Sequence, residues 1–93
     1  MAVSIDQEAQ ELAARIGRRV VEIRTAKGWS QKDFATAMNT SVQWISQVET
    51  GRNLTVHSLV RLARILGVRV PDLFRAPRKT TTAKGPGRPR KSR

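Results

Sequence analysis

Two short helical patterns on either side of a turn restrict the fold of this chain more than any other feature. The first covers residues 31–38, and Asn39, a residue that tolerates a left-handed backbone, follows it. Ser41 then stands at the cap position of the second pattern, residues 42–50. Helices joined this closely cross at a steep angle and need a small side chain where they touch, which Ala35 supplies. The spacing therefore predicts a helix-turn-helix unit.

The second helix of this unit has two chemically different sides. Ile45 and Val48, three residues apart, are predicted to face the core, whereas Gln43, Ser46 and Gln47 are polar and face outward. Gln43 and Gln47 lie about one turn apart on one face. Because a glutamine amide can form two hydrogen bonds with adenine in the major groove, this outward side is a candidate for reading bases.

Apolar periodicity elsewhere predicts three more helices and an all-α fold. A long helix is expected over about residues 6–27, a shorter one begins at Thr55 or Ser58 and ends at Gly67, and a final short helix covers residues 71–74. The residues predicted to face the core are Leu12, Ile16, Val20, Ile23, Trp29, Phe34, Leu59, Leu62, Ala63 and Leu66. No stretch alternates in the manner of a strand.

Basic residues are concentrated at the C-terminal end. The chain has 93 residues and a net charge of +11, with 18 Lys and Arg against 7 Asp and Glu. Residues 75–93 carry eight of the basic side chains and no acidic one, and alanine is their only apolar residue type, so they cannot form a core. We predict a folded DNA-binding domain over residues 1–74 and a disordered basic tail over residues 75–93.

Composition also narrows the function. The chain has no cysteine and a single histidine, His57, which excludes disulfides and Cys-ligated zinc and leaves no set of catalytic groups. No apolar run is long enough to span a bilayer, and the first ten residues do not resemble a secretory signal. We expect a cytoplasmic, nucleoid-associated protein that is not an enzyme and uses no cofactor or metal. Its expected partner is a polyanion, and neither a membrane nor a small-molecule ligand is evident as a partner.

The segment SQKDFATAMNTSVQWISQVETG, followed by RNLTVHSLVRLARILGV, resembles the Cro/repressor (Xre-type) helix-turn-helix family. The resemblance covers about residues 16–74 and implies a compact five-helix lambda-repressor-like domain that binds double-stranded DNA. Three residues depart from the usual pattern: Asn39 replaces a glycine, Phe34 a leucine, and Trp44 a serine or threonine. The phrase GRNLTVHSL further resembles the controller proteins of restriction–modification systems.

The resemblance also implies roles for individual residues. The base-contacting set is Val42, Gln43, Ser46 and Gln47, and the backbone-contacting set is Gln31, Thr40, Ser41, Arg52 and Asn53. Trp44 departs from the family pattern and joins the backbone-contacting set only because an exposed tryptophan beside Gln43 could stack on sugar or phosphate. Gln31 would also brace the second helix, and Arg24 and Glu49 match a structural ion pair. Trp44 is open to two interpretations, stacking on the DNA backbone or packing on Val48 or the preceding helix. A further set is expected to form a solvated or intersubunit face: Arg61, Arg64 and Arg69.

The tail contains a segment that resembles the core of an AT-hook. Its residues are Gly87, Arg88, Pro89, Arg90 and Lys91, and proline and arginine there suit an extended backbone in a narrow, negative minor groove. Pro86 stands where the motif normally has a second arginine. The alternative is a nonspecific tail that binds phosphates by counterion release.

The leading hypothesis is a sequence-specific transcription regulator that binds a palindromic operator as a homodimer. The residues expected at the dimer surface are Val68, Val70, Leu73 and Phe74. Two alternatives stay open at this point. An antitoxin would bind a partner protein and repress its own operon, and a nucleoid architectural protein would depend mainly on its basic tail.

Overall fold

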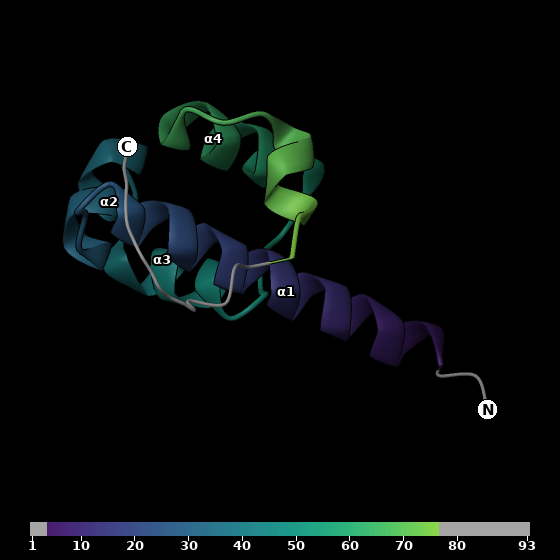
Figure 1. Ribbon diagram of the computed structural model, residues 1–93. Helices are drawn as coiled ribbons and strands as arrows, with labels where there is room; N and C mark the ends of the chain where they lie inside the picture. Colours follow the sequence, from purple (N-terminus) through teal and green to yellow (C-terminus); the bar gives the residue numbers. More distant parts are fainter. Residues whose placement is uncertain (1–3, 77–93) are drawn as a thin grey trace.

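The computed structural model describes residues 4–76, and these form four α-helices followed by a short 3-10 helix (Figure 1). The elements are α1 (Ile5–Ala26), α2 (Gln31–Met38), α3 (Val42–Glu49), α4 (Val56–Leu66) and η1 (Val70–Phe74). No strand occurs within residues 4–76, so the all-α prediction is confirmed. The expected fifth helix is present as a 3-10 turn around Pro71, whose missing N–H restricts it to the start of a helix.

Side-chain caps fix where the helices begin. Ser30 and Asp33 form a reciprocal capping box at α2, in which each side chain accepts from the other residue's backbone N–H. Thr55 and Ser58 form the same arrangement at α4, which places the start of that helix after Thr55. These hydrogen bonds satisfy N–H groups that the helices themselves leave unpaired.

The core lies where α1, α2, α3, α4 and η1 meet. Its buried apolar side chains are Ile16, Val20, Phe34, Ala35, Met38, Ile45, Val48, Leu62, Ala63, Leu66 and Leu73. Trp29 packs against the edge of this cluster, with its ring centroid 5.9 Å from that of Phe34. The apolar positions predicted from periodicity in α2, α3 and the second half of α1 therefore share one core.

The first half of α1 projects beyond the other helices (Figure 1). Ile16, Gly17 and Val20 are buried, but Leu12 is 39% exposed, so the prediction that Leu12 faces the core is wrong. Periodicity identified the correct face of the helix but not the length over which other elements cover it. Gly17 marks the covered part, because a Cβ there would lie 2.4 Å from the backbone oxygen of Glu49.

The end of the domain is more buried than its sequence suggests. Leu73 has no exposed surface and belongs to the core, so it cannot contribute to the predicted dimer surface. Arg19 of α1 donates from Nε to the backbone oxygen of Asp72 at 2.9 Å, which ties η1 to α1. Phe74 is 39% exposed, and Val68 and Val70 are half-buried.

Two further predictions concern a membrane span and the tail. Within residues 4–76, no helix is both long and apolar enough to cross a membrane. The predicted tail contacts, Arg88, Pro89, Arg90 and Lys91, lie outside residues 4–76.

Candidate nucleic-acid interface

The turn between α2 and α3 has the backbone that the sequence predicts. Asn39 adopts φ 56° and ψ 51°, in the left-handed region that asparagine tolerates better than most residues. The Thr40 N–H donates to the Ala35 backbone oxygen at 2.9 Å, and the Ser41 hydroxyl accepts from the Trp44 N–H at 3.0 Å. Ala35 is buried, and α2 and α3 pack against each other. The turn therefore fixes the direction in which α3 leaves α2.

The outward side of α3 brings the predicted base-contacting residues together. Gln43 and Ser46 are exposed, Val42 is 43% exposed, and Gln47 is half-buried. The opposite side consists of residues in the core: Ile45 and Val48, both without exposed surface. Because the core holds α3 along one side, its polar side chains project from a fixed helix.

A buried carboxylate holds the end of α3 to α1 and α2. Glu49 is 9% exposed, and Arg24 donates to it from Nε at 2.6 Å and from Nη2 at 3.3 Å. Gln31 donates from Nε2 to the same carboxylate at 2.9 Å, and Arg24 also donates from Nη1 to the Trp29 backbone oxygen at 2.7 Å. The structure thus joins the two members of the expected ion pair and adds Gln31, which links the first turn of α2 to the last turn of α3.

The loop after α3 lies against its outward side. The Arg52 N–H donates to the Gln47 backbone oxygen at 2.7 Å. Asn53, at φ 60°, donates from Nδ2 to the side-chain oxygen of Gln47 at 2.5 Å. The amide group of Gln47 keeps its two N–H donors for other partners. Arg52 and Asn53 are exposed beside it, so the predicted backbone contacts border the predicted base contacts.

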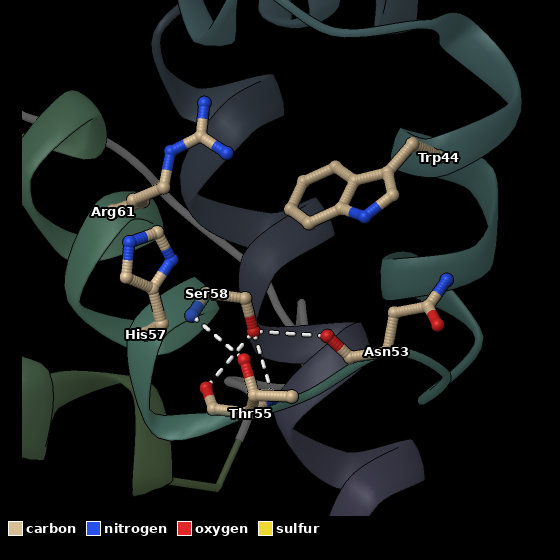
Figure 2. A pocket seen from close by; sticks show the side chains of 6 residues that line it. All are labelled: Trp44, Asn53, Thr55, His57, Ser58 and Arg61. Atoms are coloured by element: carbon tan, nitrogen blue, oxygen red, sulfur yellow. Dashed lines mark hydrogen bonds between the residues drawn. The ribbon is translucent and has the colours of Figure 1, made fainter.

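The side chain of Trp44, a residue of α3, lies on the side of that helix facing α4, a position that neither sequence interpretation named. It packs on the edge of the core, and the guanidinium carbon of Arg61 lies 5.9 Å from its ring centroid (Figure 2). Arg61 also donates from Nη2 to the Met38 backbone oxygen at 2.6 Å. Arg61 is half-buried, so its side chain makes internal contacts that the expectation of a solvated or intersubunit face did not include. The unusual tryptophan in the motif was the signal that pointed to this region.

Electrostatics at the start of α2 follow from its cap. Hydrogen bonds from Ser30, first from its backbone N–H and then from its side chain, hold the pKa of the Asp33 carboxyl below its ordinary value. Residues 4–76 contain no group of three or more His, Cys, Asp or Glu side chains placed to hold a metal ion. The chemistry of this surface is that of hydrogen-bond donors, amides and arginines.

Residues 20–73 match the family described as Helix-turn-helix, and this match covers more than half of the chain. The chain belongs to that family. The match begins in α1 and ends within η1, so it includes the turn at Asn39 and both sides of α3. The resemblance to Xre-type regulators is confirmed, and the protein is a helix-turn-helix DNA-binding transcriptional regulator.

Solved structures agree with this family. The restriction-modification controller protein C.AhdI from Aeromonas hydrophila is 33% identical, with a TM-score of 0.62 over 67% of this chain and 96% of that one. A hypothetical transcription factor, NHTF from Neisseria, is 30% identical, with a TM-score of 0.66 over 74% of this chain and 80% of that one.

One curated relative comes from a yeast. Multiprotein-bridging factor 1 of Candida glabrata is 34% identical over 62 residues, which is 66% of this chain. The chain spans about two fifths (41%) of the length of that relative. The shared part is therefore a domain, and the activity of the whole yeast protein is not carried over by it.

Proposed function

We propose that this regulator binds a pseudo-palindromic operator as a homodimer, with α3 of each subunit in the major groove. The observation that carries the proposal is the contrast across α3. Its outward side presents Gln43, Ser46 and Gln47, while Ile45 and Val48 have no exposed surface. The major groove admits an α-helix and offers a distinct pattern of donors and acceptors for each base pair.

Roles on this surface divide between bases and backbone. Gln43 and Gln47 are the proposed readers of base edges, with Ser46 between them and Val42 placed to contact a thymine methyl group. The proposed backbone contacts come from α2, from the turn, from the first turn of α3 and from the following loop: Gln31, Thr40, Ser41, Trp44, Arg52 and Asn53. Gln31 donates to Glu49, so its contribution to DNA binding includes holding α3 in place.

The proposed homodimer interface lies at the C-terminal end of the domain, around η1. Val68 and Val70 are half-buried, and Phe74 is 39% exposed, which leaves apolar surface around η1 for a second subunit. Dimers with this motif bind half-sites whose centres are about 10–10.5 base pairs apart. Controller proteins of restriction–modification systems are the narrower class that the structural neighbour C.AhdI favours.

Residues 75–93 are proposed to add affinity without sequence preference. They carry eight basic side chains and no acid. Affinity decreases with salt, and the steepness of log affinity against log salt decreases by roughly 0.9 for each phosphate that is no longer neutralised. Deletion of residues 75–93 is therefore expected to make this dependence less steep by about 2–5 per subunit. The preferred sequence is expected to stay the same. A changed preference would contradict this division of roles.

The tail deletion also tests the AT-hook interpretation. If Arg88 enters a narrow minor groove, the deletion weakens binding more on operators with A/T-rich flanks than on operators with G/C-rich flanks. Equal losses on both flanks indicate phosphate contacts alone. No loss on either would contradict a role in DNA binding and favour a protein partner.

Selection of bound duplexes from a random DNA pool tests the proposed function. The expected result is a two-fold symmetric sequence with half-site centres about one helical turn apart. Binding without any enriched sequence would overturn the proposal and favour a nucleoid architectural protein. Stoichiometric capture of one protein in place of DNA would favour an antitoxin.

A further inference from the structure

One arginine of α4 contacts both helices of the helix-turn-helix unit. Arg61 donates from Nη2 to the Met38 backbone oxygen at 2.6 Å, at the last residue of α2. The same guanidinium lies over the ring of Trp44 in the first turn of α3, with its carbon 5.9 Å from the ring centroid. Figure 2 shows the two side chains pointing toward one another from α4 and α3.

This geometry suits a guanidinium in particular. Arginine presents several N–H donors in one plane and stacks on aromatic faces, whereas the lysine ammonium is compact and strongly hydrated. The Met38 carbonyl belongs to the end of a helix, where backbone oxygens lack partners within the helix. One side chain can therefore satisfy this oxygen and contact the Trp44 ring at the same time.

The contact spans the turn whose geometry sets the direction of α3. Met38 immediately precedes Asn39, and Trp44 is the third residue of α3. Arg61 thus joins the residue before the turn to the start of the helix after it, on the side facing α4. Glu49 and its partners hold the other end of α3. At the first turn, Arg61 adds a side-chain contact from α4 to the Ser41 cap, the hydrogen bond from Thr40 to Ala35 and core packing.

We infer that Arg61 is a positioning residue for sequence recognition, acting through Trp44 and the Met38 carbonyl to fix the start of α3 against α4. The inference rests on the proposed function of α3. It assigns to Trp44 a role that does not require the tryptophan to touch DNA. Small displacements of the first turn of α3 would move Val42 and Gln43, the proposed base contacts nearest to it.

The test compares Arg61→Gln with Arg64→Gln on the full chain. Arg64 lies on the same helix and is exposed, so both variants lose one positive charge. Affinity is measured for the duplex that the wild type selects from a random pool and for a scrambled duplex of equal composition, each over a range of salt concentrations. Arg61→Gln is expected to lower the ratio of the two affinities about fivefold to tenfold, and Arg64→Gln to leave it unchanged.

The salt dependence separates positioning from direct contact. A positioning role leaves the salt slope on the scrambled duplex equal to that of Arg64→Gln. If Arg61 instead contacts a phosphate, both duplexes lose affinity together and the slope falls by about 0.9. That result, or an unchanged affinity ratio, would overturn the inference. A wild type that selects no sequence would instead overturn the proposed function.

A spectroscopic readout and a second variant cover the case in which Arg61→Gln loses stability. The indole N–H resonance of Trp44, assigned with Trp44→Phe, is expected to shift in Arg61→Gln while that of Trp29 stays in place. Trp44→Leu is expected to lower the affinity ratio as Arg61→Gln does, and the double variant to add little. Fully additive losses in the double variant, or an unshifted Trp44 resonance, would show that the two residues act separately and contradict the inference.

Discussion

The two sides of α3 differ in how their residues are held. On the inward side, Ile45 and Val48 have no exposed surface, and Glu49 receives hydrogen bonds from two other helices. On the outward side, Gln43 and Ser46 are exposed. Changes on the inward side should therefore lower stability, whereas changes on the outward side should alter sequence preference and leave stability nearly unchanged.

The largest expected effect is that of Glu49→Gln. Its carboxylate and the Arg24 guanidinium are both largely buried, so neutralising one leaves the other charge without a partner, at a cost of about 3–5 kcal/mol in the free energy of unfolding. Urea unfolding at neutral pH measures it. Glu11→Gln, at an exposed carboxylate on α1, is the control and should change stability by less than about 0.5 kcal/mol. Equal free energies of unfolding for Glu49→Gln and Glu11→Gln would contradict a stabilising ion pair.

A smaller effect is expected from Gly17→Ala, which tests the contact between α1 and the inward side of α3. The added Cβ would lie 2.4 Å from the Glu49 backbone oxygen and 2.9 Å from that of Val48, so α1 must move away. This is expected to cost about 1–3 kcal/mol, because overpacking outweighs the higher helix propensity of alanine. A thermal melt measures it, and a Tm equal to or above that of the wild type would show that the helices separate without cost.

The smallest effect concerns an exposed acid that contrasts with buried Glu49. The pKa of Asp33 is lowered from its ordinary value of 3.8 by its hydrogen bonds to Ser30. Its stabilising contribution is thus present above 3.8 and is lost as the pH falls through the lower pKa of the folded state. Asp33→Asn should lower Tm near neutral pH by less than either variant above. The difference in Tm between the wild type and Asp33→Asn should become smaller below pH 3.8. A difference that widens in acid would contradict the sign.

Local features of the fold were predictable because they depend on residues close together in sequence. The left-handed backbone at Asn39, the buried Ala35 and the inward pair Ile45 and Val48 follow from turn chemistry and helical spacing. The pairing of Arg24 with Glu49 came instead from the family resemblance, since 25 residues separate them.

Features that depend on distant elements were not predictable from periodicity. Leu12 lies on the correct face of α1, but nothing in its spacing shows that α1 extends past its partners. Leu73 resembled spare apolar surface and is core, because α1 and α4 both reach η1. Arg61 contacts Met38 across 23 residues through a long, flexible side chain, and helical spacing places such a residue on a face without naming its partner.

The most direct test of the contrast across α3 is the sequence preference of Gln43→Ala and Gln47→Ala, measured on single-base variants of the selected operator. Each variant is expected to lose about 1–3 kcal/mol of discrimination at one or two base pairs in each half-site. Its Tm should stay close to that of the wild type. Preference unchanged across all operator variants in both proteins would contradict the account, because the outward side of α3 would then not read the DNA sequence.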